Sequence, residues 1–173
     1  KSYLNWLVSC YNTPSFIASD PIQFPRHFSE PKDIEIAALL TAVITWGKRP
    51  TILKSCDKMF QLMDNQPYSF IMNGQWQILN PQMNIHRTFF VRDLQYLCNG
   101  LKNIYLQHES MEDFFVGVSP WVGVGRLREA LLDANGGLPS KHISDPKLSH
   151  NTGSACKRMH LMLRWLVRND GIV

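Results

Sequence analysis

The sequence lacks the cysteine spacing of common metal and redox sites. No two of its four cysteines form a CxxC pair, so zinc-ribbon and iron–sulfur motifs are absent. Three lie on apolar faces of helical patterns, which predicts buried free thiols in a reducing compartment. His150, Cys156 and His160 also lack the tight, repeated spacing of zinc ligands. We expect no metal and no cofactor. The four cysteines are Cys10, Cys56, Cys98 and Cys156.

Long apolar runs and targeting signals are missing as well. No run of about eighteen apolar residues occurs, which excludes a helix able to span a membrane. The first residues show no signal-peptide pattern. We therefore expect a cytoplasmic protein without a membrane partner. Both ends read as cut, because residues 1–11 already resemble the middle of a helix and the chain ends on the apolar pair Ile172–Val173. We expect a longer natural chain.

The alternating pattern of β-strands is absent almost everywhere, and we find no internal repeat or low-complexity segment. Apolar residues instead recur at intervals of three and four, which is typical of helices. A chain of 173 residues with 45% hydrophobic residues is large enough for one globular core. We predict a single all-α domain over residues 1–173, a bundle of roughly eight helices whose C-terminal part is missing from this sequence.

The most apolar stretch, residues 33–46, predicts a central buried helix. It is apolar on nearly all sides and includes several small residues, which favour close neighbours. Asp33 is predicted to cap this helix and Gly47 to end it. Thr88 is predicted to cap a long helix over residues 89–107. The other predictions are helices at 1–11, 50–63 and 123–132, with loops or irregular segments at 12–31, 76–84 and 138–151.

The last thirty residues predict a helix with two different faces. Candidate N-cap residues place its start near Gly153, and Gly171 supplies its end. At about 100° per residue, Arg164 and Arg168 each fall within about 20° of Lys157, and the three residues form a basic stripe. The opposite face is apolar and is predicted to be buried: Ala155, Cys156, Met159, Met162, Leu163, Leu166 and Val167.

Lys157 and Arg158 break a local rule, because the helix dipole disfavours cations in the first turn. Such departures often mark functional sites, and the free N–H groups of a helix start suit a phosphate. The alternative is a solvated lysine on a surface helix. A net charge of +4 and a pI near 9.0 are compatible with a nucleic-acid partner without establishing one.

Two segments resemble the helix-hairpin-helix DNA glycosylases. Residues 39–47, followed by Lys48 and Arg49, are similar to the buried core helix and following turn of these enzymes. Residues 153–158 are similar to their hairpin, in which a glycine lies four residues before the catalytic lysine. In this sequence these two positions are Gly153 and Lys157.

The chain also resembles an uncharacterised bacterial family placed in that superfamily. The resemblance spans residues 11 to 158 and is carried by short motifs: Tyr11-Asn12-Thr13-Pro14, Asp20-Pro21-Ile22-Gln23-Phe24-Pro25, Asp33-Ile34-Glu35-Ile36, Thr45-Trp46-Gly47-Lys48-Arg49, His86-Arg87-Thr88-Phe89, His142-Ile143-Ser144-Asp145-Pro146 and Ser154-Ala155-Cys156-Lys157-Arg158.

The resemblance implies a DNA-binding glycosylase of the base-excision type, which would flip a base out of the duplex. The amine of Lys157 would attack the sugar C1′, after losing its proton through burial and nearby cations. The resemblance also implies phosphate contacts from backbone amides and basic side chains. These residues are Gly153, Ser154, Arg158, Arg164, Arg168, Lys48 and Arg49.

Two departures keep other functions open. Ala155 replaces the second hairpin glycine, and no residue matches the catalytic aspartate of the glycosylases. The first alternative is a non-enzymatic nucleic-acid binder of the same fold, and the second is a helical interaction or scaffold module. Structural alternatives also exist for single motifs. Lys48–Arg49 would be a solvated turn, Trp46 a core residue, and His86–Arg87 an anchor between a loop and the long helix.

Overall fold

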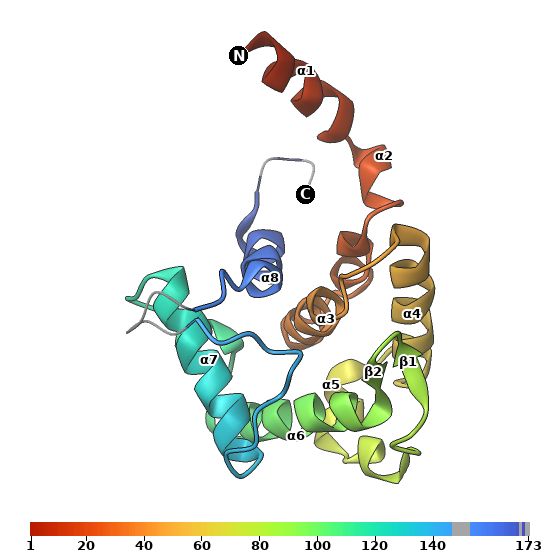
Figure 1. The fold of residues 1–173 in the computed structure, drawn as a ribbon, viewed down its shortest axis with the longest axis vertical. Coiled ribbons are helices and arrows are strands. Elements are labelled where there is room, and N and C mark those ends of the chain that lie inside the picture. Colours follow the sequence, from red (N-terminus) through yellow and green to blue (C-terminus); the bar gives the residue numbers. More distant parts are fainter. Residues whose placement is uncertain (147–152, 170, 172–173) are drawn as a thin grey trace.

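A computed structural model describes residues 1–146, 153–169 and 171 and confirms an all-α protein (Figure 1). Its α-helices are α1 (Ser2–Tyr11), α2 (Pro14–Ile17), α3 (Pro31–Val43), α4 (Arg49–Gln61), α5 (Pro67–Met72), α6 (Val91–Gln107), α7 (Pro120–Ala134) and α8 (Lys157–Val167). Short 3₁₀ helices are η1 (Pro21–Gln23), η2 (Pro25–His27), η3 (Gln75–Ile78) and η4 (Met111–Phe114). One hairpin pairs β1 (Asn84–His86) with β2 (Phe89–Phe90).

Helix α3 lies at the centre of the core, as its sequence predicts. Every residue from Ile36 to Val43 is buried. The start of the helix differs from the prediction, because Pro31 occupies the first turn and Glu30 is the N-cap residue. Asp33 does not cap α3. Its carboxylate instead accepts a hydrogen bond of 2.8 Å from the backbone N–H of Tyr68, which ties α3 to α5.

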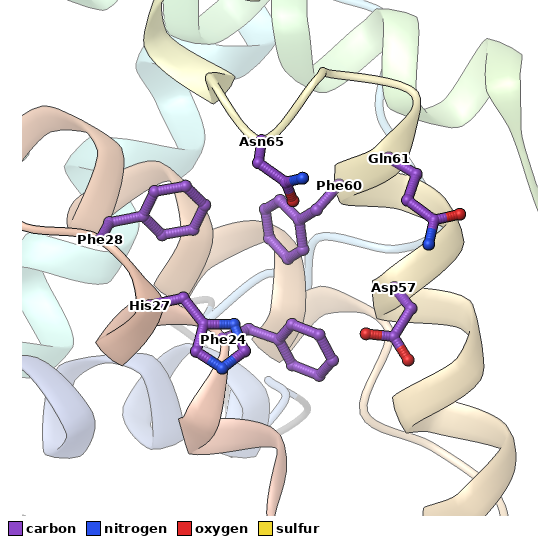
Figure 2. A pocket seen from close by; sticks show the side chains of 7 residues that line it. All are labelled: Phe24, His27, Phe28, Asp57, Phe60, Gln61 and Asn65. Carbon is purple, nitrogen blue, oxygen red and sulfur yellow. The ribbon is translucent and has the colours of Figure 1, made fainter.

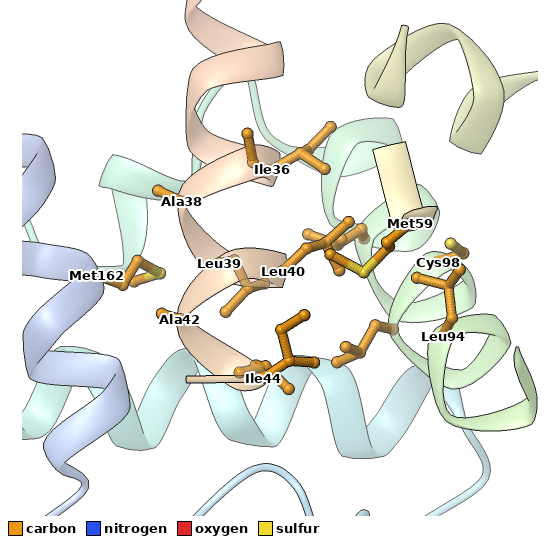
Figure 3. Packing of buried hydrophobic residues seen from close by; sticks show 14 of the residues in the cluster. Ile36, Ala38, Leu39, Leu40, Ala42, Ile44, Met59, Leu94, Cys98 and Met162 are labelled. Atoms are coloured by element: carbon orange, nitrogen blue, oxygen red, sulfur yellow. The ribbon is translucent and has the colours of Figure 1, made fainter. Parts of the chain in front are cut away.

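The two sides of α3 pack differently (Figure 3). The small side chains of Ala38 and Ala42 face Met162, so α8 packs against this side of α3. On the other side, Leu40 and Met59 join α3 to α4. Burying a leucine or methionine side chain, such as that of Leu40 or Met59, stabilises the fold by about 1.5–3 kcal/mol. These contacts on both sides hold α3, and with it the C-terminal end of the helix, in place within the core.

A β-hairpin occupies part of the segment that was predicted to be irregular or helical. The two strands are antiparallel and meet in a tight turn, where Arg87 adopts a positive φ of 47°. Helix α6 begins at Val91, and the Asp93 carboxylate accepts a hydrogen bond of 2.8 Å from the N–H of Phe90. The prediction that Thr88 caps this helix is wrong, because Thr88 lies in the turn of the hairpin.

The bounds of the last two helices also differ from the predictions. Helix α7 begins at Pro120 after the N-cap Ser119, so the predicted start at Gly123 lies inside the helix. Helix α8 begins at Lys157 and ends at Val167, a shorter range than 153–171. Val167 is 75% exposed, so it does not belong to the predicted core face. The candidate N-caps Asn151 and Thr152 lie outside the described residues.

Helix α1 extends away from the rest of the protein (Figure 1) and has no buried residue. The following segment, residues 12–31, was predicted as a loop and instead contains α2, η1 and η2. Its Phe24 is buried against α4. Cys56, Cys98 and Cys156 are buried free thiols, as predicted, whereas Cys10 is exposed. In the described part of the chain, no helix is both long and apolar enough to cross a membrane.

Candidate functional site

Four segments that are far apart in the sequence meet around Trp46. The ring of His142 stacks on the indole at 5.4 Å between centroids, and His86 meets it edge-on at 4.8 Å. The guanidinium of Arg158 lies over the same ring at 5.1 Å. We call these four residues the Trp46 cluster. It brings together the end of α3, the hairpin, the loop after α7 and the start of α8.

His86 is the buried polar centre of this cluster, at 1% exposure. Its Nε2 lies 2.8 Å from the carbonyl oxygen of Trp46, and its Nδ1 lies 2.9 Å from Oγ of Ser55. Because a carbonyl only accepts, Nε2 must carry the hydrogen. His86 therefore anchors its loop to neighbouring segments, as the structural alternative predicted. Its partners, however, are Ser55 of α4 and Trp46 in the segment after α3, rather than the long helix α6.

His142 is the second buried histidine, at 6% exposure. Its ring packs edge-on against Phe89 at 5.0 Å. Its Nε2 faces Oδ1 of Asp93 at 3.5 Å, too far for a good hydrogen bond, and has no other partner among the described residues. This nitrogen is a polar atom without a full hydrogen bond inside the fold.

Several groups act on the charge of His142. Burial lowers its pKa below the usual value of 6.5, and the positive charges of Lys141 and Arg158 act in the same direction. The carboxylate of Asp93 opposes them. Because burial dominates, the imidazole is neutral at pH 7 and the site is suited to a neutral ring stacked on Trp46.

Arg158 connects the start of α8 to the end of α3. Its half-buried guanidinium donates a hydrogen bond to the carbonyl oxygen of Val43, the last residue of α3, and burial lowers its pKa. The C-terminal end of a helix carries partial negative charge and unpaired carbonyls, so a cation is stabilising there. Arg158 is therefore a structural cap of α3, which the sequence pattern did not indicate.

Exposed cations flank every segment of the Trp46 cluster. Each is one or two residues from a cluster member: Lys48, Arg87, Lys141 and Lys157. We call these four the basic rim. None of them forms an ion pair within the part of the chain that the structure describes.

Arg87 is held in the basic rim by the backbone beside it. Its guanidinium packs so closely on Gly47 that a Cβ there would lie 2.9 Å from a guanidinium nitrogen. Arg49 is directed elsewhere, because its side chain lies over the ring of Phe16 and 3.9 Å from the carboxylate of Asp20. Of the two predicted cations after α3, only Lys48 therefore joins the rim.

The other predicted phosphate contacts are separated from the rim or already occupied. The N–H of Ser154 donates to the carbonyl of Asp145 at 3.0 Å, so it is not free for a phosphate. Gly153 is exposed, just before α8. Arg164 is exposed about 10 Å further along α8. Arg168 lies beyond it and is hydrogen-bonded to the side chain of Asn12.

Lys157 is exposed at the first position of α8. A lysine that acts as a nucleophile is usually desolvated, and this side chain is not. No described carboxylate pairs with it, and among residues 135–146 and 153–156 no helix forms a first hairpin element. Its predicted catalytic role stays a prediction.

Comparisons with known proteins identify the family without giving an activity. The model of the family described as "Protein of unknown function (DUF2400)" matches residues 20–173, and the chain belongs to this family. The predicted resemblance to an uncharacterised family is thus confirmed. No curated protein and no solved structure matches the chain. The likeness to helix-hairpin-helix glycosylases is not shown by these comparisons.

Proposed function

We propose that this protein binds nucleic acid by contacting the phosphate backbone with its basic rim. The observation that supports the proposal is that four exposed cations, from segments up to 109 residues apart (Lys48 to Lys157), each lie within two residues of the Trp46 cluster and form no ion pair with the described residues. Like charges that gather without acidic partners create a positive potential, which attracts a polyanion and raises its rate of association. The proposal concerns the rim alone and needs no chemistry at Lys157.

Two acidic side chains near the Trp46 cluster, those of Asp93 and Asp145, have partners of their own. Asp93 is only 14% exposed and accepts from the N–H of Phe90 while facing His142. Asp145 pairs with Arg128 at 3.3 Å. The four rim cations are exposed, so an external anion can reach them.

The Trp46 cluster supports the rim and is not expected to read bases. Trp46 is already contacted by His142, His86 and Arg158, so its ring is occupied rather than free to stack on a base. Binding through phosphates alone positions a protein without giving sequence specificity. We therefore expect similar affinities for unrelated sequences.

A glycosylase or lyase with Lys157 as its nucleophile is the second candidate. One observation favours it: Lys157 lies in the basic rim, so a bound backbone would pass close to its amine. This candidate requires a preference for damaged DNA, whereas the first does not. A duplex that contains one abasic site separates the two.

The test is fluorescence anisotropy with a labelled duplex, with and without an abasic site, over a series of salt concentrations. Contacts by four cations predict a slope of log K against log salt of about −3 to −4. The variant Lys48→Gln/Arg87→Gln/Lys157→Gln should bind about tenfold or more weakly and reduce that slope. The control Lys102→Gln/Arg126→Gln/Arg164→Gln removes the same charge elsewhere and should change affinity about twofold at most.

Each outcome decides between the candidates. Equal losses in the two triple variants would refute the rim as the binding surface, and no binding at low salt would refute nucleic-acid binding by this chain. A clear preference for the abasic duplex that is lost in Lys157→Ala would favour the enzymatic candidate instead.

A further inference from the structure

A second site lies on another side of α4, between the end of this helix and η2 (Figure 2). It is a pocket of about 220 Å³. The residues that line it come from η2 and its flanks and from the C-terminal half of α4 and the turn after it: Phe24, His27, Phe28, Asp57, Phe60, Gln61 and Asn65. None of them belongs to the Trp46 cluster or the basic rim.

The inner wall of the pocket is formed by aromatic rings that pack on one another. Phe24 stacks on Phe60 at 5.6 Å with an angle of 22° between the rings, and Phe28 meets Phe60 at 5.7 Å. Phe24 and Phe60 are 3% and 2% exposed. Phe28 is half-buried, so part of its ring remains accessible. Aromatic faces carry partial negative charge and attract cations.

The outer edge of the pocket is polar and rich in acceptors. Asp57 and Gln61 lie one turn apart on α4, and Asn65 follows in a left-handed conformation with φ 52°. These three exposed side chains form no hydrogen bond or ion pair with the described residues. The neighbouring Lys58 does not neutralise Asp57 by contact, because its amine donates to the carbonyl oxygen of Asn84.

We propose that this pocket binds a guanidinium group. Asp57 supplies the only carboxylate of the lining, and it forms no ion pair with a lysine or arginine in the part of the chain that the structure describes. The amide oxygens of Gln61 and Asn65 supply further acceptors. A guanidinium combines a positive charge, a flat face suited to stacking on phenylalanine, and five N–H donors in one plane. The pocket offers a counterpart for each of these properties.

The sign of the charge separates this site from the proposed nucleic-acid surface. The basic rim repels cations, whereas the pocket presents one carboxylate and attracts them. A guanidinium group can come from a free arginine-like compound or from an arginine side chain of another protein. An uncharged guanine edge offers a similar row of donors, so guanosine is the informative competitor.

The test is an NMR titration of the ¹⁵N-labelled chain with N-acetyl-arginine-N-methylamide. Saturable shifts are expected at the amides of Phe28, Gln61 and Asn65. The citrulline counterpart has nearly the same shape without the charge and should bind about tenfold more weakly or worse. The lysine counterpart should also bind more weakly, because it lacks the planar donors.

Variants then assign the binding to the pocket. Asp57→Asn changes an exposed side chain and should weaken binding about tenfold or more, whereas Asp133→Asn on α7 should leave it unchanged. Phe28→Leu keeps an apolar side chain and should weaken binding by loss of the ring face. The unchanged spectra of free variants serve as the check of folding. Free arginine and an arginine-containing tetrapeptide, compared by affinity, distinguish the two sources of the group.

The proposal is overturned if citrulline binds as well as arginine, if guanosine binds in preference, or if Asp57→Asn binds like the wild type. It does not depend on nucleic-acid binding. Asp57→Asn should leave duplex affinity unreduced, and the triple variant of the basic rim should still bind arginine.

Discussion

Replacing Arg158 by methionine tests whether this cation is a cap of α3 or an open phosphate contact. Methionine keeps much of the length and apolar stem of the side chain and removes the charge and the donors. The carbonyl of Val43 then loses the guanidinium as its partner, and the ring of Trp46 loses the cation above it. Lys157→Met removes the same charge from the preceding, exposed position.

The expected loss of stability follows from these contacts. A hydrogen bond from a charged donor contributes about 1.5–3 kcal/mol. A cation over an aromatic ring adds about 0.5–2 kcal/mol, with the larger values applying to desolvated pairs. Because Arg158 is half-buried and the contributions share one group, we expect a total near 2–4 kcal/mol rather than their full sum. Lys157→Met has no described contact to lose and should cost less than about 0.5 kcal/mol.

Urea denaturation followed by tryptophan fluorescence measures both variants, with an unchanged m-value as the sign that the unfolding transition remains comparable. The nucleic-acid assay should show the reverse order, since Lys157→Met removes a rim cation and Arg158→Met does not. Equal stabilities of the two variants would refute the assignment of Arg158 as a cap. A larger loss of duplex affinity in Arg158→Met would show that its guanidinium leaves α3 to bind phosphate.

The remaining predictions concern His142 and Gly47. Because burial holds the pKa of His142 in the folded protein below 6.5, the unfolded chain binds protons more readily. The free energy of unfolding should therefore fall as the pH decreases below about 7. Urea titrations at pH 7.5, 6.5 and 5.5 should show that this free energy depends less on pH in His142→Phe than in the wild type. Gly47→Ala combines strain at φ +106° with a contact on Arg87, whereas Gly117→Ala has φ +70° and open space around it. Thermal melts should show a loss of about 1–3 kcal/mol for Gly47→Ala and a smaller loss for Gly117→Ala, and equal losses would contradict the packing of Arg87 on Gly47.

The sequence predicts the elements whose signal is local. The apolar run of residues 33–46 predicts α3 and its central position, because a helix that is apolar on nearly all sides can only be buried. The polar loop after α7 is likewise confirmed for residues 138–146. Breaks in the helical pattern were harder to place. The hairpin has strands of only three and two residues, which is too short for the alternation that predicts strands.

The start of α8 shows why helix bounds depend on tertiary contacts. The prediction near Gly153 followed the rule for N-cap residues, but Ser154 is held by the carbonyl of Asp145 and Cys156 adopts a left-handed φ of 45°. The helix therefore begins three residues after Ser154. With this start of α8, the Arg158 side chain lies against α3 and that of Lys157 is in solvent. A helical wheel does not show which helix lies beside α8, so it could not assign these two roles.

The candidate site was predicted in part, because its residues were seen as separate motifs. Three of the short motifs carry Trp46, His86 and His142, and nothing in their spacing indicates that these rings touch. The role of Arg158 depends on a carbonyl 115 residues away, and that of Arg168 on Asn12, 156 residues away. Contacts over such separations are set by the packing of whole helices, so spacing along the chain cannot reveal them.

The end of α3 links the structural and the proposed binding roles of this region. The carbonyl of Val43 at this end accepts from the guanidinium of Arg158, and the carbonyl of Trp46, three residues further on, accepts from the Nε2–H of His86. These bonds hold the hairpin and α8 against the segment that carries Trp46. The same contacts place an exposed cation of each segment beside the Trp46 cluster, and in the proposed binding surface these like charges repel one another. An anion that binds there would relieve this repulsion and stabilise the folded chain by mass action. A duplex should therefore raise the melting temperature at low salt, and it should do so less in the triple variant of the basic rim than in its charge-matched control.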